Sequence, residues 1–122
     1  MNIRAEILDK AKQCICHDRE DQYGSPENNF KAIANLWNAY LENKYPYDPE
    51  KPYGTPELTP TDVALMMALM KIARIQSGIF KRDSFVDAAG YWACAGEVAG
   101  VKFEETEECF SPGLHVLKGE LL

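Results

Sequence analysis

The residues best suited to chemistry in this sequence lie between Lys71 and Tyr91, where charged side chains interrupt two apolar segments. Side chains three or four residues apart share one face of a helix. Cations share a face on the first segment, carboxylates and a tyrosine share one on the second, and further cations lie between. These residues are Lys71 and Arg74, then Asp83, Asp87 and Tyr91, with Lys81 and Arg82 between the segments. A helical hairpin would bring them together as a mixed charged cluster.

Asp87 is the member of this cluster that is hardest to explain as an ordinary surface residue. It is flanked on both sides by apolar residues, and burying an unpaired carboxylate costs several kcal/mol. We therefore expect either a structural ion pair with Lys71 or Arg74, or a role in binding a ligand or a metal. Asp83 has a simpler alternative role as a helix cap. Lys71 and Arg74 could instead lie at a solvated helix end, where cations interact favourably with the helix dipole.

A second polar group surrounds the predicted start of a helix at Ser25 and Pro26, a capping residue followed by proline at the first helical position. Helix N-termini bind anions because their N–H groups are free and the helix dipole is positive there. Simpler alternatives stay open: Glu27 could pair with Lys31, and Tyr23 could pack against the turn. The group consists of Arg19, Tyr23, Glu27, Asn28 and Asn29.

Taken together, the two groups predict nucleotide chemistry. Mg²⁺ takes carboxylate oxygens together with water and phosphate oxygens, so Glu27, Asp83 and Asp87 are the predicted metal ligands. Asp83 and Asp87 are also the predicted catalytic residues, since water activated by the metal or by a carboxylate would attack a phosphorus. Cations would neutralise the phosphates, and Tyr23 or Tyr91 would stack on a base. The predicted ligand-binding residues are Arg19, Tyr23, Asn29, Lys71, Arg74, Lys81, Arg82 and Tyr91.

Four segments with helical spacing of apolar residues would position these side chains. The first carries apolar residues from Ile3 to Ile15, and the second begins at Pro26 and ends near Glu42. The third starts with a capping box at Thr59 and stops at Gly78, and the fourth reaches about residue 100. On the second segment, one face carries Phe30, Ile33, Ala34, Trp37 and Leu41.

The predicted fold is all-α. It is a four-helix bundle-like domain over residues 1–100, followed by a short irregular or β C-terminal tail at 101–122. Residues 43–59 hold four prolines and three tyrosines, which predict a long loop within the domain. Residues 88–96 of the fourth helix are apolar on nearly every side, which is typical of a helix buried all round. Because a four-helix monomer has little interior for such a helix, we expect a homo-oligomer.

Charge and apolar runs argue against two classes of partner. A net charge of −6 argues against duplex nucleic acid, which is bound by clustered Lys and Arg. The longest apolar run, residues 63–70, has eight residues, whereas a membrane span needs roughly 20, so these residues are expected in the core. The N-terminus lacks the apolar centre of a signal peptide, which predicts the cytoplasm, or the host cytoplasm for a phage-encoded chain. Cys14, Cys16 and Cys94 are then expected to be reduced and buried.

Two stretches that contain both polar groups resemble a known kind of protein. They are residues 18–37 (DREDQYGSPENNFKAIANLW) and 62–91 (DVALMMALMKIARIQSGIFKRDSFVDAAGY). They are similar to a group of small phage and prophage proteins, related in pattern to a helical nucleotide-modification-associated domain. The likeness implies that the family pattern includes Arg19, Tyr23, Asn29, Lys71, Arg74, Arg82, Asp83 and Asp87.

More distantly, the chain resembles the MazG-like all-α nucleoside triphosphate pyrophosphohydrolases. That group binds Mg²⁺ with an E-x-x-E helix followed by an E-x-x-D helix. This chain has Lys71 and Arg74 where the first glutamate pair is expected, and its later pair is Asp83-x-x-x-Asp87. The resemblance implies nucleotide binding, and hydrolysis would need Glu27 or Asp62 to complete the set of carboxylates.

Three functions stay open. The leading hypothesis is a phage-type helical oligomer that binds a nucleotide or related phosphorylated metabolite, with Mg²⁺-dependent hydrolysis to a monophosphate and pyrophosphate as its catalytic form. The second is a non-catalytic protein that sequesters a host signalling nucleotide. The third is a structural or interaction module in which Asp87 pairs with Arg74 for stability alone.

Overall fold

A computed structural model describes residues 2–18, 21–22, 24–51 and 54–103. These ranges contain four α-helices and one short π-helix, and no strand occurs in them, so the predicted all-α fold is confirmed. The elements are α1 (Ile3–Gln13), η1 (Cys14–Asp18), α3 (Pro26–Lys44), α4 (Pro60–Gln76) and α5 (Arg82–Val98). None of the helices in these ranges combines the length and the apolar content needed to cross a bilayer. Most of the predicted tail at 101–122 lies outside the described residues.

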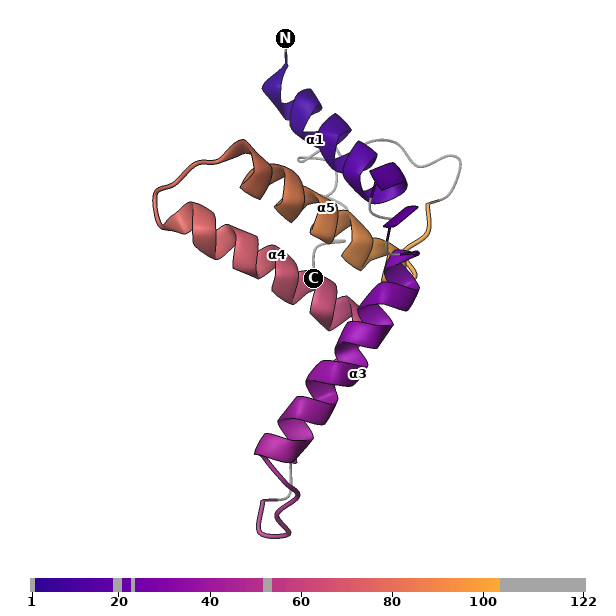
Figure 1. Ribbon diagram of the computed structural model, residues 1–122, viewed down its shortest axis with the longest axis vertical. Helices are drawn as coiled ribbons and strands as arrows, with labels where there is room; N and C mark the ends of the chain where they lie inside the picture. The colour runs from indigo at the N-terminus through magenta and orange to yellow at the C-terminus, as the bar shows by residue number, and fades with distance from the viewer. Residues whose placement is uncertain (1, 19–20, 23, 52–53, 104–122) are drawn as a thin grey trace, which may run out of the picture.

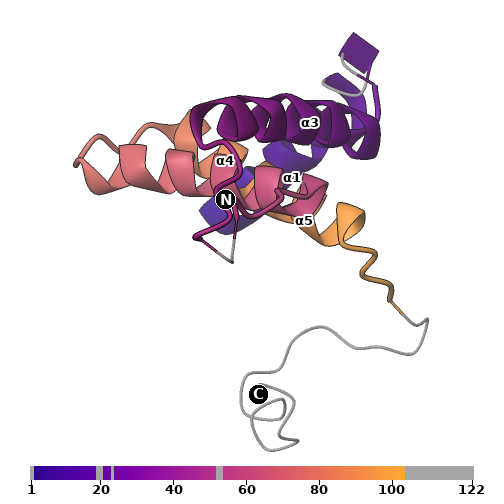
Figure 2. The ribbon, with the colours of Figure 1, turned by 90° about the horizontal axis from the view of Figure 1, so that it is seen from below.

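The arrangement is built on an antiparallel hairpin of α4 and α5 (Figure 1). Helix α1 packs along α5, and α3 crosses the end of the hairpin that lies opposite the α4–α5 turn. The C-terminal half of α3 extends beyond the other helices and leads into the loop that returns to α4 (Figure 1). Seen from below, α3 lies on one side of the hairpin (Figure 2).

The helix boundaries follow from local hydrogen bonds. Ser25 Oγ accepts a hydrogen bond from the Asn28 amide at 3.3 Å, which caps α3. At the start of α4, the Asp62 amide donates to Thr59 Oγ1 at 3.1 Å, and the Thr59 amide donates to Asp62 Oδ2 at 2.8 Å. Helix α4 ends before Gly78, whose φ of +97° suits glycine. Both predicted helix starts and this stop are confirmed.

The predicted proline-rich loop is present, and hydrogen bonds join its C-terminal end to α3. Asn38 Nδ2 donates to the Leu58 carbonyl at 2.9 Å, and the Leu58 amide donates to Asn38 Oδ1 at 2.8 Å. One side chain thus satisfies both backbone groups of a loop residue next to the α4 cap. The loop follows α3, which ends at Lys44, slightly beyond the predicted end near Glu42.

The core lies where α3, α4 and α5 meet. The predicted apolar face of α3 is confirmed, because Phe30 and Ala34 are buried and Ile33 and Trp37 pack against them. The buried cluster consists of Phe30, Ala34, Val63, Ala64, Cys94 and Ala95.

The expectation that residues 63–70 lie in the core is met by Val63, Ala64 and Ala68 and not by the rest of the run. Within this run, Met66, Leu69 and Met70 are exposed. Helix α5 was expected to be buried on all sides within a homo-oligomer, and Trp92 is exposed in the single chain. The described helices cover only part of the circumference of each of these helices, which apolar content alone does not reveal.

Candidate functional site

A cavity of about 250 Å³ opens where η1, α3, α4 and α5 meet. Its walls are mainly apolar, with Phe30 and Ile33 from α3 and Met67 from α4. Polar groups enter it from two helices, since Asn29 comes from α3 and Asp87 and Tyr91 from α5. One member of the polar group around residue 27, Asn29, and two members of the group between residues 71 and 91, Asp87 and Tyr91, therefore meet at one cavity.

Helical periodicity explains why α5 contributes so much of the wall. Asp87, Gly90, Tyr91 and Cys94 follow at intervals of three or four residues and so share one face. Tyr91 also contacts α3, with its ring centroid 6.3 Å from that of Phe30 and the two rings tilted by 54°. This aromatic contact joins the wall of α5 to that of α3.

The short π-helix η1 closes one side of the cavity. A Cβ built on Gly90 would lie 3.0 Å from Ile15 Cγ2, so η1 packs directly against the backbone of α5. The sequence predicted a regular helix through Ile15, and the change to a π-helix after Gln13 corrects that expectation. A π-helical turn is a local departure that often occurs at functional sites. The signal that could have indicated this close approach is a glycine in the middle of an apolar helix.

The cysteines differ from the expectation that all are buried. Cys94 is buried, Cys14 is half-buried and Cys16 is exposed. Cys14 and Cys94 come from different elements and line the same cavity, which the sequence did not predict.

The central polar contact of the site is an ion pair between α4 and α5. Lys71 Nζ lies 3.0 Å from Asp87 Oδ2, and the two side chains are only 14% and 18% exposed. The sequence left Lys71 and Arg74 open as partners, and the structure shows Lys71. Lys71 follows the buried Ala64 and Ala68 at helical spacing and so points into the hairpin, whereas Arg74 is exposed.

The rest of the predicted mixed cluster is not brought together. Asp83 lies in the first turn of α5, where its side chain is 85% exposed and 3.9 Å from that of the equally open Arg82. Both line a separate hollow with Lys10 rather than the cavity beside Asp87. Lys81 is the N-cap of α5 without a side-chain capping bond, and it is exposed. The expectation of a single cluster is wrong because the four-residue step from Asp83 to Asp87 leads from the exposed turn end of the hairpin toward its interior.

The three predicted magnesium ligands do not form one cluster. Glu27 is exposed on the first turn of α3, Asp83 is exposed at the hollow, and Asp87 is held by Lys71. Within the described ranges, no three His, Cys, Asp or Glu side chains come close enough to share a metal ion. Because Mg²⁺ can be bound by one or two carboxylates with water and phosphate oxygens, the magnesium site stays a prediction. Arg19 and Tyr23, predicted to bind the ligand, lie outside the described residues.

The sequence matches one family over the whole of this site. The model of the family "Domain of unknown function (DUF6378)" matches residues 6–99, which is most of the chain. The chain belongs to the DUF6378 family. The match contains all residues described above as lining the cavity, from Cys14 to Cys94.

Curated relatives of this DUF6378 chain come from bacteriophages, as the resemblance of residues 18–37 and 62–91 predicted. It is 40% identical over 92 residues to the Gene 55 protein of Mycobacterium phage D29, covering 75% of this chain and 52% of the relative. It is 37% identical over 101 residues to the Gene 55 protein of Mycobacterium phage L5, covering 83% and 55%. The chain thus spans about half the length of these relatives.

The more specific resemblances are not established by these matches. No solved structure matches the DUF6378 chain. The links to a nucleotide-modification-associated domain and to the MazG-like pyrophosphohydrolases stay predictions.

Proposed function

We propose that this DUF6378 domain binds a nucleotide or a related phosphorylated metabolite and does not hydrolyse it. The carrying observation is the Lys71–Asp87 ion pair, 3.0 Å long and largely buried, at the wall of a cavity that is otherwise mainly apolar. Desolvating an ion pair costs free energy that packing of apolar residues would not. A charged group retained at such a place is a candidate for ligand recognition.

The polar groups of the cavity suit a planar ring that carries N–H donors. The Asp87 carboxylate accepts hydrogen bonds, and the Asn29 amide both donates and accepts them. Phe30 and Tyr91 supply aromatic surface for a ring to stack on. A cavity of about 250 Å³ is slightly below the usual range of roughly 300–1,000 Å³ for small-molecule sites, so it suits one base rather than a whole nucleotide.

The phosphates would then lie outside the cavity, at the start of α3. Gly24 and Pro26 line the cavity immediately before and at the first turn of this helix. A helix N-terminus offers free N–H groups and a positive dipole end to an anion. The exposed Arg74, Lys81 and Arg82 lie on other parts of the hairpin and are not needed for this arrangement.

Binding without hydrolysis is favoured by the separation of the acidic residues. A hydrolytic reaction with Mg²⁺ would need Glu27 or Asp62 to complete a cluster with Asp83 and Asp87, and no group of three such side chains occurs among the described residues. Sequestration of a signalling nucleotide would be consistent with this proposal, because binding alone requires no further catalytic carboxylates. Hydrolysis to a monophosphate and pyrophosphate is the competing outcome that the experiment must detect.

The test is calorimetry with a panel of nucleoside mono- and triphosphates, with Mg²⁺ and with a chelator. We expect binding selective for one base, unchanged by the chelator, with the nucleotide recovered intact by chromatography. A lost charged hydrogen bond is worth about 1.5–3 kcal/mol, so Asp87→Asn should weaken binding roughly 10- to 100-fold.

Asp83→Asn is the matched control, because it makes the same change on the same helix outside the cavity. It should leave the Kd unchanged. The proposal fails if no nucleotide binds the folded protein, or if Asp83→Asn weakens binding as much as Asp87→Asn. Release of pyrophosphate would show hydrolysis instead.

A further inference from the structure

Large apolar side chains are exposed along one face of the α4–α5 hairpin. On α5, Phe85 and Trp92 are seven residues apart and so lie on the same side of the helix, two turns from each other. On α4, Leu69 and Ile72 are three residues apart and also share a side. The turn between the helices adds two more. The hairpin face thus consists of Leu69, Ile72, Ile79, Phe80, Phe85 and Trp92, which are between 37% and 74% exposed.

The α5 part of this hairpin face lies on the side of the helix opposite to the cavity. Gly90 contacts η1 through Ile15, and Tyr91 contacts α3 through Phe30, so α5 turns these residues toward the cavity. Phe85 and Trp92 project from the opposite side of the helix. Figure 2 shows α3 lying on one side of the hairpin.

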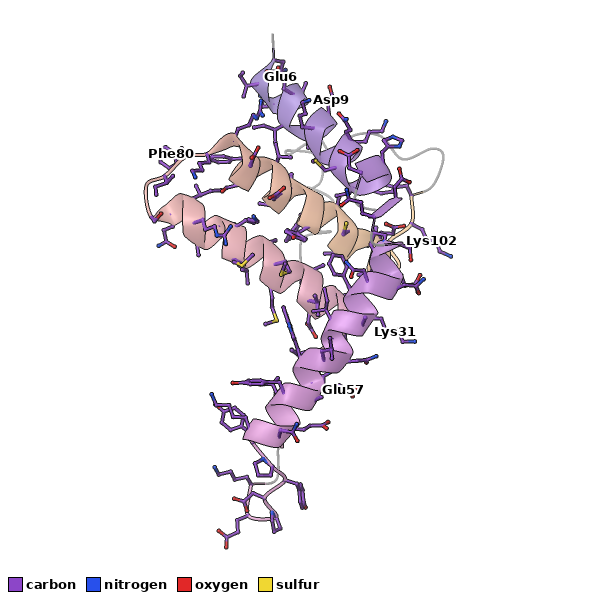
Figure 3. The ribbon with its side chains drawn as sticks, viewed as in Figure 1. Glu6, Asp9, Lys31, Glu57, Phe80 and Lys102 are labelled. Carbon is purple, nitrogen blue, oxygen red and sulfur yellow. The ribbon has the colours of Figure 1, made fainter. Side chains whose placement is uncertain are left out.

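The hairpin face is continuous from the turn into α5. The ring centroids of Phe80 and Phe85 are 6.5 Å apart, which joins the turn to the first part of the helix. Phe80 lies at the turn end of the hairpin, as Figure 3 shows. The two phenylalanines therefore form one apolar surface at the turn, and Trp92 continues it on the same side of α5 two turns further on.

The size of the patch exceeds what a monomer usually exposes. A fully exposed aromatic side chain has roughly 150–250 Å² of surface, so Phe80, Phe85 and Trp92 alone expose on the order of 350 Å². The three aliphatic residues extend the patch past the ~300–600 Å² that is the upper end for monomeric proteins. A stable dimer buries about 800 Å² on each partner, which two 17-residue helices, each roughly 25 Å long, can supply.

The charge of the patch indicates what covers it. None of its six residues is charged, although the chain has a net charge of −6. Anionic membranes and nucleic acids attract proteins with an excess of Lys and Arg, whereas this chain has 13 Lys and Arg against 19 Asp and Glu. In a two-fold interface the same patch of both copies is buried, so a charged side chain close to the two-fold axis would face its own copy. An uncharged face on an acidic chain avoids that repulsion.

We propose that two copies of this chain form a two-fold dimer through the hairpin face, so that two α4–α5 hairpins pack as a four-helix arrangement. This gives the predicted homo-oligomer a specific interface. It is independent of the nucleotide proposal, because the cavity opens on the other side of α5. Nucleotide binding and dimerisation can therefore fail separately.

Trp92 provides a direct measure of this contact. The chain has two tryptophans, so Trp37→Phe leaves Trp92 as the only one. We expect the emission of Trp92 to be blue-shifted at micromolar concentration. On dilution to the nanomolar range it should shift to the red, because the dimer dissociates and exposes the hairpin face to water. Sedimentation velocity should give twice 13.8 kDa at the higher concentration.

Substitutions test whether a second copy of this chain is what binds the hairpin face. Trp92→Glu and Leu69→Glu should each give a monomer with unchanged helical circular dichroism, and the pair guards against failure of one variant to fold. Leu36→Glu, at an equally exposed leucine on α3, should leave the dimer intact.

The proposal is overturned by a wild-type monomer at high concentration. In such a monomer, red-shifted emission of Trp92 would mean that the hairpin face is exposed to water. Blue-shifted emission that does not depend on concentration would mean that another part of the same chain covers this face. It is also overturned if both glutamate variants remain dimeric.

Discussion

Replacing Lys71 with methionine should destabilise the protein by about 2–3 kcal/mol. Methionine keeps a flexible apolar stem and removes the ammonium group that lies 3.0 Å from Asp87. At that distance the attraction is about 5–6 kcal/mol for an effective dielectric constant near 20, before desolvation is subtracted. Breaking a fully buried pair costs roughly 3–5 kcal/mol. We lower this range because both side chains, at 14% and 18% exposure, retain some contact with water.

Arg82→Met supplies the matched comparison. It removes a cation that lies 3.9 Å from Asp83, where both side chains are more than three-quarters exposed. Exposed pairs contribute at most about 1 kcal/mol and often nothing measurable. Urea unfolding followed by circular dichroism should therefore show a clear loss for Lys71→Met and almost none for Arg82→Met.

A double variant separates stability from function. Lys71→Met combined with Asp87→Leu removes both charges and should recover most of the stability lost in Lys71→Met, to within about 1 kcal/mol of wild type. It should not recover nucleotide binding, because the carboxylate proposed to contact the base is gone. The reasoning is refuted if Lys71→Met costs no more than Arg82→Met. Recovery of binding in the double variant would refute the role of Asp87.

Two further predictions concern packing and the loop. Gly90→Ala should cost about 1–2 kcal/mol, because its Cβ would lie 3.0 Å from a methyl group of η1. Gly96→Ala, with no neighbour within 4 Å, should gain up to ~1 kcal/mol; equal stability of the two variants in urea would contradict this account. Asn38→Ala should cost about 1–2 kcal/mol and speed proteolysis of the loop before Leu58, because both bonds to that residue are lost. Unchanged cleavage would show that these bonds do not restrain the loop.

The helices and their starts could be predicted from the sequence because the deciding interactions are local. Ser25 and Thr59 bond to amides three residues ahead, and Gly78 supplies its own backbone conformation. The loop follows from prolines that cannot continue a helix. The family resemblance of residues 18–37 and 62–91 to phage proteins was likewise visible in the sequence, and the match to DUF6378 and the phage relatives confirms it at this coarser level.

The site could be predicted only in part. The sequence marked Asp87 as a carboxylate in an apolar setting, and it grouped Asn29 with the start of α3. It could not show that these two residues line one cavity, because they are distant in the chain and meet only when α3 crosses the hairpin. Spacing alone also placed Asp83 with Asp87, since residues four apart share a helical face wherever the helix lies.

What the sequence by itself determined is where helices begin and end and which side chains share a face. Only the tertiary structure decided which face is covered. It gave Asp87 the partner Lys71 rather than Arg74, placed η1 against Gly90, and left Trp92 exposed on the hairpin face. The physical reason is that capping and periodicity act over three or four residues, whereas burial depends on which helices pack against one another.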